Sequence, residues 1–543
     1  MLTGIPSTLG DSYQLNTTSL IRHAATVFGE SEVVYRRSDG SWGRSNYADE
    51  YKRMAQLAHG LYELGVGAGS MVGVIDWNSR RHLELYFSVP GVAATMLQLN
   101  LRLAPEDLAY VVSHSKSDWI FVDESLLHVA EALAPKLDVK GCFFFKQKTA
   151  YEIETSLNNV VFSEDLIADK PDTYDWPVVD EKTAAYAGYT TGTTGRPKGV
   201  YYSHRSIYLH TMGGLAALQA TFDDCVMPIT PMFHVLSWGF PQNAVAAGAK
   251  LVLPGKFAAE EFGAIGQAFI EEKVTLANGA PAIFTPMLAM MKSMPTPPDL
   301  TGVRLVSGSS EPPLSMMRGF KEITGAEVIH GYGATETTPL ATTNWRIKSG
   351  MNLSDEEKWD LKRYQGLPII GVEVKIVDPT GEEMPRDGKS VGEIVMRGPW
   401  ITESYYQLPD NADRFLDGWW RSGDVGVIDA HGYLKITDRL KDVIKSGGEW
   451  ISSIDMENAI LDSPNVKEAA VIGVPDEKWD ERPVAYVVAN DGAEVTRESI
   501  VETLSERFAK WQMPDEVYVV DEMPRTSVGK LDKKLLRKNW EEK

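Results

Sequence analysis

The chain contains 543 residues, of which 43% are hydrophobic and 24% charged, and its formal net charge is -21. This length exceeds what one hydrophobic core usually serves, so we expect at least two domains in a globular protein of ordinary composition. The acidic balance leaves no excess of Lys and Arg to neutralise phosphates over a wide surface, which excludes nucleic acid as a general partner.

Cysteine content and the N-terminal sequence favour the cytoplasm. Cys142 and Cys225 are too few for a disulfide framework and are not spaced as metal ligands. The start, MLTGIP, has no basic segment followed by an apolar run, so no signal peptide is expected. The longest uncharged stretch, 225–249, contains prolines and polar residues and predicts a core segment, not a transmembrane segment.

Short apolar runs alternate with helical patterns along the first 300 residues. We predict strands at 71–75, 119–122 and 250–253, followed by helices at 80–87, 124–137 and 259–272. Such alternation is typical of an α/β fold with largely buried sheets.

A second unit is predicted after about Thr437. Strands at 466–474 and 484–489 and helices at 455–461 and 496–511 suffice for a small α+β lid. The charged junction 438–442 is a candidate hinge. We therefore expect a large N-terminal domain, 1–438, and a C-terminal lid, 439–543.

The most informative stretch, 189–200, reads YTTGTTGRPKGV. Its glycines allow the backbone to turn tightly around an anion, while threonine hydroxyls and a lysine add further contacts. The candidate residues are Thr190, Thr191, Gly192, Thr193, Thr194, Gly195 and Lys198. The spacing does not fit the P-loop of common NTPases. A phosphate-binding loop is predicted; the alternative is a flexible surface loop.

Three further segments carry candidate site residues. The first, 330–337, follows a strand-like run that ends at Ile329, and its glycines, with Gly333 among them, are expected to turn the chain at the carboxyl edge of a sheet. There Tyr332 could stack on a base, Thr335 could donate to a phosphate, and the Glu336 carboxylate suits Mg²⁺. Core packing and a solvated turn are the alternatives.

The second segment, 418–424, ends in Asp424, and Arg439 follows 15 residues later. An Asp and an Arg can hold the two hydroxyls of a ribose. The third, 524–530, places Lys530 at the tip of a glycine-containing loop, where alone it would be a solvated lysine.

Residues 146–153, KQKTAYEI, resemble the conceptual translation of a sequencing-adapter oligonucleotide. We hypothesise that part of 143–159 is an assembly artefact that replaced or interrupted a natural loop. The alternative is a natural amphipathic surface segment, and sequencing the source DNA distinguishes the two.

Together, these four motifs in this order resemble the adenylate-forming superfamily, from about Leu15 to the C-terminus. The segments 201–205 (YYSHR), 231–238 (PMFHVLSW) and 445–453 (KSGGEWISS) are most similar to medium- and long-chain fatty acyl-CoA synthetases. The resemblance implies stacked sheets and helices in a large N-terminal domain, a mobile lid, and activation of a carboxylic acid by ATP and Mg²⁺, followed by transfer to coenzyme A.

The resemblance also implies residue roles. Lys530 would be the main adenylation catalyst, Thr335 would contact the α-phosphate, Glu336 would hold Mg²⁺, and Asp424 with Arg439 would hold the ribose. The adenine would be bordered by Tyr332 and by Gly308, Ser309, Ser310 and Glu311. Lys441 would be the hinge of the lid, and the face carrying Lys445, Gly447, Gly448 and Trp450 would receive coenzyme A.

Substrate identity depends on His234 and Trp238. Amino-acid-activating relatives have an Asp at the position of His234, so an amino acid is disfavoured, and Trp238 matches a gate at the mouth of a fatty-acyl tunnel. The two residues lie four apart and could instead be a packed pair on a helix. The segment 308–313, GSSEPP, departs from the family pattern, and Glu311 could face solvent or bind the adenine amino group.

Three alternatives stay open on the sequence alone. The substrate could be a short-chain, hydroxy or aromatic acid, the acyl group could pass to a carrier protein, or the protein could bind nucleotide without turnover. Members of the resembled family commonly form homodimers, so a homodimer is expected, and peripheral membrane contact is compatible with the sequence.

Overall fold

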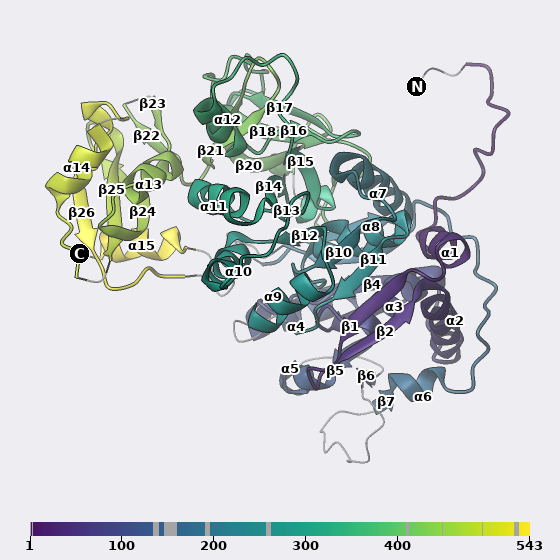
Figure 1. The fold of residues 1–543 in the computed structure, drawn as a ribbon. Coiled ribbons are helices and arrows are strands. Elements are labelled where there is room, and N and C mark those ends of the chain that lie inside the picture. The colour runs from purple at the N-terminus through teal and green to yellow at the C-terminus, as the bar shows by residue number, and fades with distance from the viewer. Residues whose placement is uncertain are drawn as a thin grey trace. The chain divides into compact units, whose positions relative to one another are not determined.

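The structure is a computed structural model that describes residues 2, 4–133, 141–145, 160–190, 196–256, 262–408, 412–447, 449–490, 492–505, 507–525 and 531–542. The chain divides into two compact units. Figure 1 colours the chain by residue number from the N-terminus to the C-terminus. The first unit comprises Met1–Glu373 with Arg397–Asn411, and the second comprises Val374–Met396 with Ala412–Lys543.

Two large sheets form the frame of the first unit within the described residues. The nine-stranded sheet has the order β16 (Leu367–Pro368), β15 (Leu340–Asn344), β14 (Glu327–Gly333), β13 (Arg304–Ser307), β12 (Leu276–Gly279), β10 (Cys225–Pro228), β11 (Lys250–Leu253), β1 (Glu32–Arg36) and β2 (Trp42–Asn46). The seven-stranded sheet has the order β7 (Val160–Phe162), β6 (Gly141–Phe145), β5 (Trp119–Asp123), β3 (Met71–Ile75), β4 (Thr95–Gln98), β8 (Ala184–Tyr189) and β9 (Gly199–Ser203).

Most neighbouring strands in the two sheets are parallel, and their residues are largely buried. Strands β3 and β5 are buried at all five positions, which is why they appear in the sequence as continuous apolar runs. The strands predicted at 71–75, 119–122 and 250–253 are observed as β3, β5 and β11. The predicted mixed α/β fold is confirmed.

Helices connect and cover these strands. They are α1 (Thr18–Val27), α2 (Tyr47–Glu63), α3 (Arg80–Gly91), α4 (Pro105–Ser115), α5 (Leu127–Leu133), α6 (Ser163–Ile167), α7 (His204–Leu218), α8 (Phe240–Ala247), α9 (Phe262–Glu271), α10 (Pro281–Ser293), α11 (Leu314–Thr324) and α12 (Asp355–Lys362). Polar N-caps fix several starts: Asn46, Ser79 and Ser203 accept a hydrogen bond from the N–H three residues later in α2, α3 and α7.

The helix predicted at 124–137 begins differently. Residues Glu124–Leu126 form a 3₁₀ turn, η1, and the α-helix α5 starts only at Leu127. The Asp123 carboxylate accepts from the N–H of Ser125, two residues on, and this local bond favours a tight turn over an immediate α-helix.

The second unit contains two five-stranded sheets within the described residues. One consists of β17 (Glu373–Val377), β18 (Gly392–Arg397), β19 (Phe415–Leu416), β20 (Trp419–Ile428) and β21 (Leu434–Arg439). The other consists of β22 (Ile444–Ser446), β23 (Glu449–Ile451), β24 (Val466–Asp476), β25 (Asp480–Ala489) and β26 (Glu516–Val519), with helices α13 (Ser453–Leu461), α14 (Arg497–Ser505) and α15 (Lys533–Glu541).

Alternation along β24 assigns the two faces of the latter sheet. Val471 packs in one cluster with residues of α13 and α14, whereas Ala470 and Ile472 pack in another with Leu536 of α15. Side chains alternate between faces along a strand, so α13 and α14 cover one face and α15 covers the other.

The helix predicted at 496–511 is shorter than expected. Helix α14 ends at Ser505, and a separate 3₁₀ turn, η7, covers Lys510–Gln512. Ala509 between them is extended, with φ -70° and ψ 154°, which breaks the helical path. The predicted boundary at 438 lies inside the second compact unit, and the hinge near Lys441 stays a prediction.

In the part of the chain that the structure describes, no helix combines the length and hydropathy needed to cross a membrane.

Candidate active site

The predicted phosphate-binding loop starts from the antiparallel hairpin of β8 and β9. The N–H of Thr190 donates to the Lys198 carbonyl oxygen at 3.0 Å, and the N–H of Lys198 donates to Thr190 Oγ1 at 3.1 Å. These two bonds close the base of the loop. The predicted site residues 191–195 lie outside the described residues.

The strand-like run predicted to end at Ile329 is longer than expected and continues as β14 to Gly333. The chain turns only after Gly333, into the 3₁₀ turn η5 (Thr335–Thr337). A side chain at Gly333 would collide with the Pro339 carbonyl oxygen, and this close approach explains the glycine. Tyr332 therefore lies on the strand and is half-buried.

Thr335 and Glu336 in η5 are held by tyrosines from elsewhere in the first unit. Tyr202 Oη on β9 donates to the Thr335 carbonyl oxygen at 2.8 Å. Tyr405 Oη donates to Glu336 Oε1 at 2.7 Å, and the Thr402 N–H donates to the Glu336 carbonyl oxygen at 2.8 Å. The backbone and the carboxylate of Glu336 are thus both fixed.

Tyr405 also links this turn to the base of the phosphate-binding loop. Lys198 Nζ lies 5.0 Å from the centroid of the Tyr405 ring, within the range of a cation–π contact. The structure thus brings Lys198, Thr335 and Glu336 together through the two tyrosines. We call these three residues with Tyr202 and Tyr405 the phosphate-side cluster.

The two tyrosines of this cluster were missed by the sequence reasoning. Burial raises the pKa of Tyr202 well above its usual value, and the nearby Glu336 charge adds to the shift. Tyr202 therefore remains a neutral hydrogen-bond donor. Tyr405 lies 69 residues from Glu336 in the sequence, and no local sequence pattern predicts such a pair.

The segment around His234 and Trp238 has an unusual backbone. Residues Val235, Leu236, Ser237 and Trp238 have φ between 46° and 58°, in the left-handed region that side chains rarely adopt. The alternative that His234 and Trp238 form a packed pair on a right-handed helix is therefore wrong. Both side chains are half-buried.

Trp238 lies against the segment predicted to border the adenine. A Cβ added to Gly308 would lie 2.9 Å from Trp238 Cη2 and 2.7 Å from the Gly331 carbonyl oxygen. Gly308 is therefore a glycine because a strand and an indole ring approach its backbone closely. The predicted acyl-side and adenine-side residues are neighbours here.

Two buried asparagines hold the chain that leads to His234. Asn78 Nδ2 donates to the carbonyl oxygens of Pro228 and Thr230 at 2.7 and 3.0 Å, and Asn78 Oδ1 accepts from the Met232 N–H at 2.7 Å. Asn278 Oδ1 accepts from the Ile229 N–H at 2.9 Å.

Asn278 also supports the left-handed segment itself. Its Nδ2 donates to the Ser237 carbonyl oxygen at 2.7 Å, while Ser237 Oγ donates to the Thr230 carbonyl oxygen at 2.6 Å. We call Asn78 and Asn278 the asparagine clamps. Sequence reasoning missed both, since single asparagines carry no pattern.

Glu311 forms an ion pair. Its Oε1 accepts from Arg363 Nε at 2.7 Å, and both side chains are 20% exposed. Glu311 is thus held by an arginine rather than facing solvent alone. Ser309 and Ser310 beside it are exposed, and Ser309 has φ 71°.

The carboxylate of Glu336 is the metal-ligand candidate. Among the described residues, no group of three or more His, Cys, Asp or Glu side chains could hold a metal ion. A single fixed carboxylate fits Mg²⁺, which usually takes one or two protein carboxylates and completes its shell with water and substrate phosphates.

In the second unit, Asp424 and Arg439 are cross-strand partners on β20 and β21. Arg439 Nε lies 3.6 Å from Asp424 Oδ1, and both side chains are partly accessible. The structure thus places side by side the two residues predicted to hold a ribose.

The predicted hinge and coenzyme A residues follow directly. Lys441 and Lys445 are exposed, whereas Asp438 is buried and accepts from the Arg439 and Ser453 N–H groups at 2.7 and 2.5 Å. Gly447 has φ 62°, a conformation that favours glycine. Gly448, Lys530 and the side chain of Trp450 lie outside the described residues.

Comparison with protein families gives two matches that together span most of the chain. Residues 21–406 match the family described as AMP-binding enzyme, and residues 455–530 match the AMP-binding enzyme C-terminal domain. The first match alone covers more than half of the sequence.

Curated relatives match along nearly the whole chain. The long-chain-fatty-acid–CoA ligase of Thermus thermophilus is 41% identical over 99% of this chain and 98% of its own length. The medium-chain-fatty-acid–CoA ligase of Ectopseudomonas oleovorans is 37% identical over 97% of this chain and 96% of its own length.

Among solved structures, the anthranilate CoA ligase in complex with anthranoyl-AMP superposes with a TM-score of 0.84 at 22% identity, covering 97% of this chain and 98% of that one. At this identity the likeness concerns the fold.

Proposed function

The chain belongs to the AMP-binding enzyme family, and from this premise we propose that it activates a medium- or long-chain fatty acid. It is an AMP-forming acyl-CoA synthetase: a carboxylate oxygen attacks the α-phosphorus of ATP and pyrophosphate leaves, then the thiol sulfur of coenzyme A attacks the acyl carbon, loses its proton and displaces AMP. The observation that carries this conclusion is the 41% identity along 99% of the chain to a fatty-acid–CoA ligase.

The first step brings a carboxylate to a polyanion. Two unit charges 4 Å apart repel by about 4 kcal/mol at an effective dielectric constant near 20, which corresponds to several powers of ten in rate. In our proposal Lys198 and the loop that starts at Thr190 bind phosphates, Thr335 contacts the α-phosphate, and Lys530 neutralises the charge that develops there.

We assign Glu336 as the protein ligand of Mg²⁺. When bound, the cation would neutralise phosphate charge and polarise the phosphoryl group. The chain's own contribution is orientation, since Tyr405 donates to Glu336 Oε1 and holds the carboxylate in place.

For the nucleoside, we propose that Asp424 and Arg439 hold the ribose and that Tyr332 and the segment from Gly308 to Glu311 border the adenine. Lys441 would be the hinge of the lid. Gly447 and Gly448 would give the pantetheine arm room, beside Lys445 and Trp450.

The acyl group would enter beside His234 and Trp238. The names of the two relatives support a fatty acid, and the contact between Trp238 and Gly308 supports an acyl path next to the adenine segment. A homodimer is a further expectation from the family resemblance, and a cytoplasmic location is an expectation from the cysteine content of the sequence.

The test is a coupled assay of purified protein with ATP, Mg²⁺, coenzyme A and carboxylates from acetate to palmitate, with benzoate included. Equal amounts of AMP and thioester, with kcat/KM highest for acids of eight carbons or more, are expected. A preference for acetate or benzoate would overturn the chain-length proposal, and acyl-AMP without thioester would overturn the transfer to coenzyme A.

A further inference from the structure

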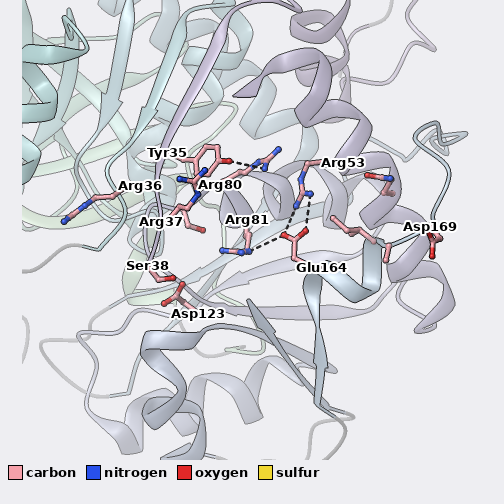
Figure 2. Close-up of a pocket in the computed structure, with 14 residues that line it drawn as sticks. Tyr35, Arg36, Arg37, Ser38, Arg53, Arg80, Arg81, Asp123, Glu164 and Asp169 are labelled. Carbon is pink, nitrogen blue, oxygen red and sulfur yellow. Dashed lines mark hydrogen bonds and ion pairs between the residues drawn. The ribbon is translucent and has the colours of Figure 1, made fainter. Parts of the chain in front are cut away.

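A cavity of about 510 Å³ lies in the first unit, lined from β1, α2, α3, the end of β5 and α6. Its wall carries five arginines: Arg36, Arg37, Arg53, Arg80 and Arg81. This concentration of positive charge contrasts with the net charge of -21 of the whole chain. None of the five belongs to the phosphate-side cluster or to the asparagine clamps. We call this cavity the arginine pocket (Figure 2).

Two of the guanidinium groups are held over one aromatic ring. Arg80 and Arg37 lie 5.0 and 5.5 Å from the centroid of the Tyr35 ring, and Arg80 Nη1 donates to Tyr35 Oη at 3.4 Å. Arg37 Nη1 also donates to the Trp42 carbonyl oxygen at 2.8 Å. These contacts fix the guanidinium groups of Arg37 and Arg80 beside Tyr35.

On the other side, one carboxylate bridges two guanidinium groups. Glu164 Oε1 lies 3.0 Å from Arg53 Nη2 and 3.7 Å from Arg81 Nε, as the dashed lines in Figure 2 show. The Glu164 side chain is 30% exposed, so it is the accessible member of this group. A competing anion could displace it at small cost, because the released carboxylate can be hydrated.

The carboxylates around the pocket do not fully compensate the arginines. Glu84 stays ionised, since Arg53 and Arg80 outweigh its burial and lower its pKa. Burial raises the pKa of Glu50 to about 7, and it also raises the pKa of Asp123. Arginine keeps its charge at any physiological pH. Among the residues that line the pocket, five arginines stand against three carboxylates, Asp123, Glu164 and Asp169, so the lining itself carries net positive charge.

We propose that the arginine pocket binds a small phosphate-bearing anion, whose oxygens take the place of the Glu164 carboxylate. Guanidinium forks match phosphate oxygens in pairs, and arginines on facing walls suit a tetrahedral group better than a planar carboxylate. The first turn of α3 contributes Arg80 and Arg81, and the N-terminal end of a helix dipole favours a nearby anion. The volume lies within the range of small-molecule sites.

The pocket lies next to one of the asparagine clamps in the sequence. Ser79, Arg80 and Arg81 line the pocket, and Asn78, directly before them, is one of the asparagine clamps. An anion here would contact the residues next to the clamp without entering the proposed nucleotide site.

The test is titration calorimetry of the full chain with inorganic phosphate and, separately, glycerol 3-phosphate. We expect saturable binding, weakened at least tenfold, about 1.4 kcal/mol, by the double variant Arg37→Gln/Arg81→Gln. The matched control is Arg397→Gln, an exposed arginine paired with Glu373 outside the pocket, which should bind like the parent chain. Tighter binding of glycerol 3-phosphate would identify a phosphate ester as the ligand, and equal binding would identify free phosphate.

A second variant keeps the proposal falsifiable if the double variant does not fold. Glu164→Gln removes the competing charge and should tighten phosphate binding severalfold. Unchanged binding by Arg37→Gln/Arg81→Gln, no tightening by Glu164→Gln, or the absence of saturation would each overturn the site.

Discussion

At the scale of single residues, the hydroxyl of Tyr405 is the contact on which the proposed metal ligand depends. It donates to Glu336 Oε1, and its ring lies beside Lys198. A hydrogen bond to a charged group contributes about 1.5–3 kcal/mol. One tyrosine thus orients a carboxylate and a cation that act on the same polyphosphate in our proposal.

Tyr405→Phe should lower kcat/KM for ATP by about 10- to 100-fold, the equivalent of that hydrogen bond, and raise the Mg²⁺ concentration needed for half-maximal rate. Pyrophosphate exchange at varied ATP and Mg²⁺ measures both. Tyr406→Phe is the matched control, since Tyr406 stacks on Tyr201 and has no contact with Glu336 among the described bonds. Equal losses in the two variants would contradict the role of Tyr405.

A buried histidine gives the protein a defined response to acid. His210 is buried, and its Nε2 accepts from the Leu340 N–H at 3.2 Å. Burial lowers its pKa from 6.5 to about 3. Between these values the unfolded chain binds more protons than the folded one, so acidification favours unfolding.

His210→Gln, which cannot titrate, should therefore lose less stability on acidification than the parent chain. Between pH 7 and pH 5 the expected difference is about 2 kcal/mol in the free energy of unfolding. Urea unfolding of both proteins at the two pH values checks this. The same pH dependence in both would show that His210 is accessible to protons in the folded state.

The residue types of the candidate site could be predicted from the sequence, but the residues that hold them in place could not. Lys198, Thr335 and Glu336 stand in motifs whose composition indicates phosphate chemistry. Tyr202 acts on a partner 133 residues away, and such a contact depends on the packing of β9 against η5, which no local signal records.

At the scale of elements, the left-handed segment Val235–Trp238 needs support from its surroundings. Each such residue costs about 1–2 kcal/mol relative to the right-handed region. The asparagine clamps and Ser237 supply hydrogen bonds on both sides of the segment. The geometry of the proposed acyl entrance is therefore maintained by groups that do not touch the substrate.

Asn278→Ala should leave the Ile229 N–H and the Ser237 carbonyl oxygen without their partner, at a cost of about 1–3 kcal/mol each. We expect the KM for the fatty acid to rise about tenfold, with the KM for ATP changed by less than about twofold. The control is Asn243→Ala on α8: Asn243 is equally buried, and its side chain makes no hydrogen bond to any described residue. A parallel rise in both KM values would mean general loss of structure.

Helices and strands could be predicted from the sequence where nearly all of their residues are buried. Strand β11 was predicted with its observed bounds because its apolar run coincides with a buried parallel strand. The end of α14 could not be predicted, because it depends on one extended residue, Ala509. The left-handed segment could not be predicted either, because it depends on asparagines that are distant in the sequence.

At the scale of the whole molecule, the proposed site residues occur in both compact units. Lys198, Thr335 and Glu336 belong to the first, while Asp424, Arg439 and Lys530 belong to the second. A change in the second unit can therefore affect one half-reaction and spare the other.

Lys530→Ala should abolish adenylation, because the charge developing at the α-phosphate would lose its cation, while thioester formation from supplied acyl-AMP continues at about the parental rate. Single-turnover assays of the two half-reactions separate them. Lys534→Ala, a substitution of a nearby lysine in α15, is the control. Equal loss of both half-reactions would refute the assignment of Lys530.

The order of strands in the nine-stranded sheet has a consequence for synthesis of the chain. Val33 on β1 pairs with Leu251 on β11, 218 residues later, and until then β1 has only its hairpin partner β2. At 5–20 residues per second a ribosome needs about 10–40 s to supply that partner. An isolated two-stranded hairpin is marginally stable in water. The nascent chain must therefore carry an open strand edge through the translation of the entire seven-stranded sheet, and slower elongation before Leu253 lengthens its exposure to aggregation and to chaperones.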